Sequence, residues 1–343
     1  MKLKKIDNNN RYTVMLFGLM AVVLAFFSIT KGNLFWKGSL WQGMMMQFPE
    51  YGCMTLGLMF AFISGHMDMS FVMLGNFASI VGVTYMAANT TESMSNSQVG
   101  GVILVGCLIA LGIAVIGGII NGLLVSGLNI PPVMATISMQ LVWQGCSTAL
   151  TKGYAVKGLP ALYTEIGHSK VFGFLPFPLL VFLILFLIAA FLLRRTAFGE
   201  KLYMLGTNKK ATRFSAINVH GMLLTTYILS AVFACIGVLL MVSTMGSAKA
   251  DYGTSYTMRC ILILVLAGVL PDGGMGKIFN VLLSIITIQF IATGVNLFPQ
   301  LNTYYASLIW GGLLILVLIL STKMTGNGFR VKKQRSLRRK PRR

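Results

Sequence analysis

Ten long apolar runs are the feature of this sequence that most limits what the chain can fold into. Crossing a bilayer takes roughly 20 mainly apolar residues, and only helices or closed barrels keep the backbone hydrogen-bonded in lipid. Charged residues make up 10% of the chain, against roughly 25% in a soluble domain, which argues against a water-soluble enzyme. The sequence predicts an all-α polytopic membrane protein with about ten transmembrane helices. The runs lie near residues 13–30, 43–65, 69–88, 99–120, 131–150, 174–193, 222–243, 258–271, 278–297 and 303–321.

The eighth run is too short for a full crossing. Residues 258–271 end at Pro271, and the small-residue turn 272–274 follows. We predict a short or re-entrant helix here, which a membrane tolerates only where protein buries the free backbone groups. A similar turn with an acid, residues 64–68, follows the second run. The two turns give a weak signal of an internal repeat, a common feature of transporters.

Basic residues predict which side of the membrane holds the two chain ends. An even number of spans puts both termini on one side, and placing them inside gives 21 cytoplasmic Lys and Arg residues against 7 outside. Because cytoplasmic segments are enriched in these residues, cytoplasmic N- and C-termini are predicted. The densest clusters follow apolar runs, at 194–213 and in the tail 322–343. That distribution favours contact with membrane lipid over nucleic acid as the reason for the net charge of +20.

The chain divides into one transmembrane domain, residues 1–321, and a basic cytoplasmic tail, residues 322–343. The cytoplasmic loop 194–221 is too short to be a nucleotide-binding or catalytic domain. No P-loop, GxSxG or HExxH motif occurs, and the five cysteines lack the spacing of metal ligands or disulfides. We therefore expect no catalytic residue, metal or cofactor in this chain. Any transport must draw its energy from an ion gradient or from another chain.

Polar side chains within or beside the apolar runs are the candidates for contact with a translocated solute, because such groups are costly in a membrane. Competing interpretations stay open for several of them. Asp68 is also placed to cap the helix that follows it, and Asn121 to tie two helices together. Trp143 and Gln144 suit a small polar ligand, and helix packing explains them nearly as well. The candidate set is Glu50, His66, Asp68, Asn121, Trp143, Gln144 and Asn296.

The loop 194–221 carries the most specific pattern. Residues 208–217 are predicted to form a short helix capped by Asn208, with apolar residues along one side. Such a helix between two spans is either an anchor on the lipid surface or a shaped contact for another protein. The glycines and Phe214 favour the protein contact. Its candidate residues are Phe198, Gly199, Gly206, Asn208, Ala211, Phe214, Ser215 and Ile217.

Three stretches together resemble one protein family. The first is the turn 65–70, which is similar to Gly-Gly-Ile-Asp-Leu-Ser, with His66 in place of a glycine. The second runs from Asn121-Gly122 to Ile130-Pro131-Pro132, Thr136 and Met139. The third matches at Thr196, Phe198, Gly199, Gly206, Asn208, Ala211, Ser215 and Ile217. Over about residues 45–320 the chain resembles the permease subunit of bacterial ATP-binding-cassette importers, in the branched-chain amino acid and ribose permease superfamily.

The resemblance implies a function, a location and partners. The implied function is import of a monosaccharide or similar small polar solute across the bacterial inner membrane by alternating access. It implies a second permease subunit, in a homo- or heterodimer, an extracytoplasmic solute-binding protein, and two ATPases docked on residues 194–221, which would use the ATP. A nucleoside, an autoinducer furanose or a branched-chain amino acid is an alternative cargo. An ion-coupled secondary transporter is the alternative from another class, and Glu50 is the one clear coupling acid for it.

Overall fold

The computed structural model describes residues 8–91, 93–171, 173–298 and 305–324, and every structural statement below refers to those residues. All but the first three residues of the basic tail predicted at 322–343 lie outside the described residues.

Helices make up most of the described chain, and each of the ten apolar runs overlaps one. These helices are α1 (Asn8–Phe35), α2 (Gly38–Ile63), α3 (Phe71–Asn89), α4 (Asn96–Ser126), α5 (Pro132–Thr151), α7 (Phe177–Arg195), α10 (Val219–Met245), α11 (Thr254–Leu266), α12 (Ile278–Asn296) and α13 (Ala306–Met324). The shorter elements are α6 (Ala161–His168), α8 (Ala197–Thr207), α9 (Lys209–Phe214) and the antiparallel strands β1 (Lys170–Val171) and β2 (Leu175–Pro176).

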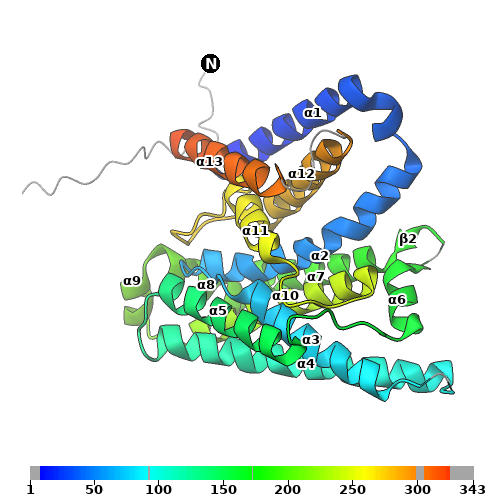
Figure 1. Ribbon diagram of the computed structural model, residues 1–343. Coiled ribbons are helices and arrows are strands. Elements are labelled where there is room, and N and C mark those ends of the chain that lie inside the picture. Colours follow the sequence, from blue (N-terminus) through cyan, green and yellow to red (C-terminus); the bar gives the residue numbers. More distant parts are fainter. Residues whose placement is uncertain (1–7, 92, 172, 299–304, 325–343) are drawn as a thin grey trace, which may run out of the picture.

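Six helices in the described part are long and apolar enough to cross a membrane, namely α1 from Tyr12, α3, α4, α7, α10 and α12. The helix α11 and the stretch Leu308–Val317 of α13 are apolar but shorter. In Figure 1, α1 begins and α13 ends toward the same side of the molecule, as an even number of crossings requires. The chain is an all-helical polytopic protein, while ten crossings and cytoplasmic termini stay predictions.

Some helices extend well beyond the apolar runs. The helix α4 begins at Asn96 and ends at Ser126, so the predicted limits 99–120 were too narrow. Its start is fixed by a capping box, in which the Gln98 side chain accepts from Ser95 N at 3.0 Å and Ser95 Oγ accepts from Gln98 N at 3.4 Å. Hydropathy misses such ends because the capping residues are polar.

The helices α2 and α10 form the centre of the bundle. All residues of α2 from Pro49 to Ile63 are buried, and α10 packs along this helix. Glycine makes the close approach possible, since a Cβ added to Gly57 would lie 2.8 Å from the Ser230 carbonyl oxygen. Small residues at crossings are how helices pack tightly in lipid, where burial of apolar surface gives no driving force.

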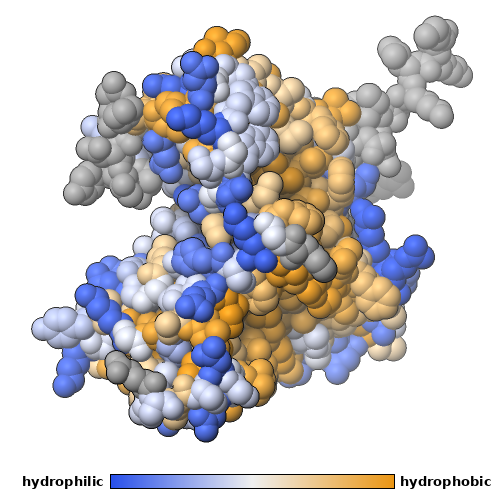
Figure 2. All heavy atoms as spheres, turned by 90° about the vertical axis from the view of Figure 1, so that its right-hand side faces the viewer, coloured by the Kyte–Doolittle hydropathy of each residue, from blue (hydrophilic) through white to orange (hydrophobic). Residues whose placement is uncertain are grey.

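The helices of the bundle are arranged in two parts. Figure 1 shows α3, α4, α5, α7 and α10 in the lower part and α1, α12 and α13 in the upper part, with α2 and α11 running between them. Figure 2 views the end of the molecule that carries α6 and β2. In that view hydrophilic residues border a notch between the two parts, and a broad apolar face lies on the right.

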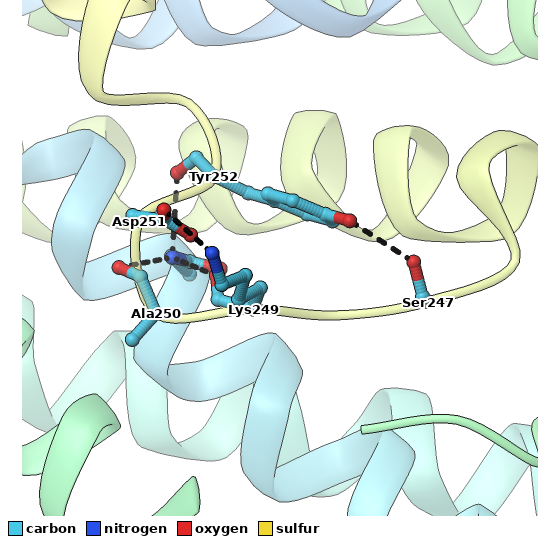
Figure 3. A network of polar contacts seen from close by, with 6 residues as sticks. Ser247, Lys249, Ala250, Asp251 and Tyr252 are labelled. Carbon is cyan, nitrogen blue, oxygen red and sulfur yellow. Dashed lines mark hydrogen bonds and ion pairs between the residues drawn. The ribbon is translucent and has the colours of Figure 1, made fainter. Parts of the chain in front are cut away.

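The predicted short helix is present as α11, which has 13 residues. At 1.5 Å per residue it spans roughly 20 Å, less than the roughly 30 Å hydrocarbon core of a bilayer. The chain between α10 and α11 is not helical, and its turn is closed by an ion pair between Lys249 and Asp251 at 2.9 Å and by a contact of Ser247 with Tyr252 (Figure 3). Non-helical chain therefore borders α11 on both sides.

An amide side chain donates hydrogen bonds to the backbone carbonyl groups of the non-helical chain before α11. Asn76 Nδ2, on α3, lies 2.9 Å from the carbonyl oxygen of Lys249, 3.0 Å from that of Ala250 and 3.3 Å from that of Tyr252. Unpaired carbonyl groups are expensive inside a membrane protein. Asn76 thus fixes where the non-helical chain ends and α11 begins.

Candidate solute cavity and partner-docking helices

The loop 194–221 folds into two helices, α8 and α9. The predicted cap is confirmed, since Asn208 Oδ1 accepts hydrogen bonds from the backbone N–H groups of Lys210 and Ala211, both at 3.1 Å. The helix stops at Phe214, short of the predicted residue 217, because Ala216 takes a left-handed conformation with φ of 58°. The helix α8 was not predicted from the sequence. Residues 197–207 form this helix and pack against the bundle.

The predicted docking residues fall into two groups. Phe198, Gly199 and Gly206 lie on α8 and face the bundle, and the Phe198 ring lies 6.4 Å from that of Phe60. Ala211, Phe214 and Ser215 are exposed, and 91% of Phe214 is accessible. Ile217 is half-buried beyond the helix. Only the second group, on α9 and just beyond it, presents side chains that another protein can reach.

Backbone meets backbone where α8 touches the end of α2 and the turn 271–276 between α11 and α12, a contact that we call the inner glycine crossing (residues 63–65, Gly206, Gly273 and Gly274). Gly274 N donates to the Ile63 carbonyl oxygen at 2.8 Å. A Cβ added to Gly206 would overlap both of those atoms. Tyr203 OH, also on α8, donates to the Gly276 carbonyl oxygen at 2.8 Å. The helix α8 is therefore fixed at once to the end of α2 and to the turn that follows the end of α11.

These two helix ends share one geometry, in line with the weak repeat signal. Gly65 and Gly268 have φ of 76° and 77°. His66 N donates to the Ala61 carbonyl oxygen at 3.0 Å, and Val269 N donates to that of Leu264 at 2.9 Å. Both are left-handed glycine caps with a bond that reaches back five residues. The acids that follow differ, because Asp68 is buried and Asp272 is exposed.

Asp68 holds three helices together behind the first of these caps. Its Oδ1 accepts from Ser70 N at 3.0 Å and from Ser70 Oγ at 2.9 Å, and its Oδ2 accepts from Ser230 Oγ of α10 at 2.9 Å. Asn121 Nδ2 of α4 donates to Ser70 Oγ at 2.7 Å. Ser70, not Asp68, is the N-cap residue of α3. Burial raises the pKa of Asp68, and the hydrogen bonds from Ser230 and Ser70 oppose that rise.

His66 lies in the same turn but outside the Asp68 network. Its Nδ1 is 2.9 Å from the Ser64 carbonyl oxygen. Burial lowers the pKa of His66, the charge of Lys209 lowers it further, and the bond to Ser64 opposes the shift. His66 therefore favours the neutral form, and the turn 64–70 carries its polar groups already paired within the protein.

A cavity of about 350 Å³ lies between α2, α6, α10 and α11, on the side predicted to face outside, and we call it the outer cavity. Glu50 Oε1 accepts from Thr244 Oγ1 at 2.7 Å, and Glu50 Oε2 accepts from Tyr256 OH at 3.3 Å. Arg259 faces the same cavity without forming a direct ion pair with Glu50. The lining residues are Gly43, Met46, Gln47, Glu50, Tyr51, His168, Thr244, Met245, Tyr256 and Arg259.

Aromatic rings and amides hold the walls of the outer cavity. The Arg259 guanidinium carbon lies 4.5 Å from the centre of the Trp310 ring, 5.2 Å from Tyr51 and 5.3 Å from Tyr256, distances at which a cation is attracted to a ring face. Tyr51 OH donates to Gln289 Oε1 at 2.5 Å. The cavity thus combines a carboxylate, a guanidinium and hydroxyl groups in the middle of the bundle.

The other predicted pathway residues lie elsewhere. Trp143, on α5, stacks on Phe77 with ring centres 5.5 Å apart. Gln144 lines an open hollow on the outer surface of α5, and Asn296 is exposed at the end of α12. The structure therefore joins His66, Asp68 and Asn121 around one turn, puts Glu50 in the outer cavity, and leaves the remaining three apart.

Sequence reasoning missed the neighbours of Glu50. Arg259 was counted only as a basic residue at the edge of a run, and Thr244 and Tyr256 gave no signal. These residues come from α10 and α11, about 200 residues away from α2, so only the fold brings them together. Besides Glu50 itself, an arginine one residue inside an apolar run is the sequence feature that pointed to this site.

Comparison with known proteins agrees with this architecture. The model of a family described as the permease component of branched-chain amino acid transport systems matches residues 40–318. The autoinducer 2 import system permease proteins LsrD of Yersinia pestis (strain Pestoides F) and Yersinia pseudotuberculosis serotype O:3 (strain YPIII) are each 28% identical over 279 residues. Each alignment covers 78% of this chain and 78% of the relative. No solved structure matches.

The family match spans most of the chain and includes the outer cavity, the turn 64–70 and the helices α8 and α9. The apolar helices around them agree with a protein of the bacterial inner membrane that crosses it several times. The chain belongs to this family of transport permeases, as an importer subunit of the branched-chain amino acid and ribose type.

Proposed function

We propose that the chain is the membrane-spanning permease subunit of an ATP-binding-cassette importer, and that it moves a monosaccharide or similar small polar solute by alternating access. Family membership supports the transport role. The relatives named as autoinducer 2 import permeases make that compound the first cargo to test. A nucleoside and a branched-chain amino acid are the other cargoes within the same family.

The arrangement of α8 and α9 is the observation that carries this proposal. Phe214 stands almost fully exposed on α9, while α8 packs at Gly206 against the end of α2 and the turn between α11 and α12. A partner bound to α9 would therefore move the end of α2 and this turn through α8. Because residues 194–221 cannot hold a nucleotide-binding domain, ATP binding and hydrolysis belong to that partner chain.

The proposed assembly has three kinds of protein partner. Two ATPases bind at the cytoplasmic face, an extracytoplasmic binding protein delivers the solute to the other face, and a second permease completes a homo- or heterodimer. Beside α9 lies a basic hollow of about 500 Å³, lined among others by Lys209, Lys210, Arg213 and His220. It suits acidic residues of an ATPase, since complementary charge speeds and orients association. In this proposal residues 1–321 form one permease domain, and 194–221 is its coupling loop.

Co-purification with the ATPase encoded by a neighbouring gene tests the docking assignment. The variant Phe214→Asp places a charge where an apolar contact is proposed, and at least a tenfold loss of bound ATPase is expected. Phe174→Asp is the matched control, because Phe174 is 72% exposed on the turn between β1 and β2, far from α9. Equal ATPase binding by Phe214→Asp and the wild type would remove α9 from the interface.

A further inference from the structure

Arg259 has a hydrogen-bonding group that the described protein leaves unused. Its Nε atom is buried and has no hydrogen-bond partner in the described part of the chain. The guanidinium carbon lies near three aromatic rings, and Arg259 lines the outer cavity. A buried donor without a partner is costly, and a charged side chain in a membrane-spanning segment is by default functional.

Glu50 offers the complementary groups on the opposite helix. An ionised carboxylate has about four acceptor positions, and two hydrogen bonds, from Thr244 and Tyr256, use part of this capacity. Glu50 and Arg259 line the same cavity and are not in direct contact. A molecule between them would therefore accept hydrogen bonds from Arg259 and donate hydrogen bonds to Glu50.

The place of this cavity in the fold supports a transport site. Tyr256 and Arg259 lie in the first turns of α11, and Thr244 lies at the end of α10. The cavity therefore lies beside the non-helical chain 246–253 that joins α10 to α11. Transporters hold their cargo where irregular backbone lines a polar space within the protein.

The charged side chains that line the outer cavity indicate which class of molecule can bind there. Glu50, Arg259 and His168 line the cavity, so a cation would meet Arg259 and an anion would meet Glu50. Hydroxyl groups both donate and accept, and therefore match both side chains without a net charge. The ring faces of Tyr51 and Tyr256 suit the apolar side of a small ring. A volume of about 350 Å³ lies at the small end of ligand pockets.

We propose that the outer cavity is a binding site for an uncharged, polyhydroxylated solute on the transport pathway, with Arg259 as its donor and Glu50 as its acceptor. This proposal rests on the proposed transport function and adds the residues that would hold the cargo. The bonds of Gln289 with Tyr51 and Gln47 make Gln289 a positioning residue for the wall.

Access from outside is the first test. In a Cys146→Ser background, which removes an exposed native thiol, Met46→Cys places a thiol in the cavity lining. Met44→Cys is the matched control, because Met44 is buried in the cluster with Phe27 and Phe35. In intact cells a membrane-impermeant maleimide should label Met46→Cys at least tenfold faster than Met44→Cys. Equal rates, or labelling only in inside-out vesicles, would overturn the proposal.

Protection from labelling is the second test, made on the full transporter complex with D-ribose, autoinducer 2 and L-leucine as probes. At least one of the uncharged hydroxylated probes should slow labelling of Met46→Cys threefold or more, and L-leucine should not. Glu50→Gln and Arg259→Lys should each abolish the protection. The site is wrong if neither hydroxylated probe protects, if L-leucine alone does, or if protection survives both substitutions.

The two proposals fail in different ways. Glu50→Gln and Arg259→Lys lie far from α9 and should retain the bound ATPase at the wild-type level. Loss of ATPase co-purification in the wild type would overturn the proposed function, while the labelling rates would still report on the cavity.

Discussion

The outer cavity and the inner glycine crossing lie at two levels of the same bundle and differ in how their residues pack. In the outer cavity, long polar side chains surround an open space of about 350 Å³. At the inner glycine crossing, three backbone segments touch directly, and no space remains for a single Cβ on Gly206. Side chains can rearrange around a ligand, whereas backbone contacts of this kind open only when whole helix ends move. The difference fits the proposal that the first region binds the solute and the second region closes the bundle.

The largest expected effect is at the inner glycine crossing. Gly206→Ala should destabilise the protein by about 1–3 kcal/mol, because the added methyl group overlaps backbone atoms and forces the three segments apart. Thermal unfolding in detergent would measure the loss. Gly112→Ala is the control, since nothing lies within 4 Å of a Cβ at Gly112, and this helical position should tolerate the change. Equal melting temperatures for the two variants would refute tight packing at Gly206.

Asp68→Asn should come next, with a loss of about 1–3 kcal/mol of stability. One carboxylate oxygen becomes an NH₂ group that faces a donor from Ser70 or Ser230. The control is Asp251→Asn, whose partner Lys249 and own side chain are 40% and 56% exposed, so that about 0–1 kcal/mol is expected. Chemical unfolding of both variants gives the comparison, and a cost for Asp68→Asn no greater than that of the control would contradict the network.

Asn76→Ala tests the support of the outer cavity. Three carbonyl groups ahead of α11 would lose their shared donor, so hydrogen exchange across residues 246–253 should speed up about tenfold, equivalent to roughly 1.4 kcal/mol. Asn89→Ala is matched to it, because Asn89 donates only within its own helix, to the Tyr85 carbonyl oxygen. Unchanged exchange in Asn76→Ala would mean that other groups hold the start of α11.

The smallest expected effect is a pH dependence at the turn 64–70. Since the folded protein lowers the pKa of His66 below its value of 6.5 in an unfolded chain, the unfolded state binds the proton more readily. The contribution of His66 to the free energy of unfolding is therefore full above about pH 6.5 and decreases as the pH falls below that value. Melting temperatures at pH 7.5 and 5.5 should differ less in His66→Gln than in the wild type. His220→Gln, at an exposed position, is the control, and an equal effect there would remove His66 as the cause.

The helices were predictable because lipid imposes length and hydropathy on each of them, and short-range caps such as Asn208 were predictable because their partners lie within three residues. The partners of Asp68 and Glu50 were not, since Ser230 is 162 positions from Asp68 and Thr244 is 194 from Glu50. Hydropathy also missed α8, whose position depends on glycines that meet two distant turns. Long-range polar pairing and backbone contact leave no periodic trace in a single sequence.

Uptake into proteoliposomes that contain the permease and its ATPase tests the central claim most directly. Labelled autoinducer 2 or D-ribose, delivered by the cognate binding protein, should accumulate only when ATP is present on the ATPase side. Accumulation should need no ion gradient and should be lost in Phe214→Asp but not in Phe174→Asp. Uptake that follows an ion gradient without the ATPase would contradict the account and favour a secondary transporter.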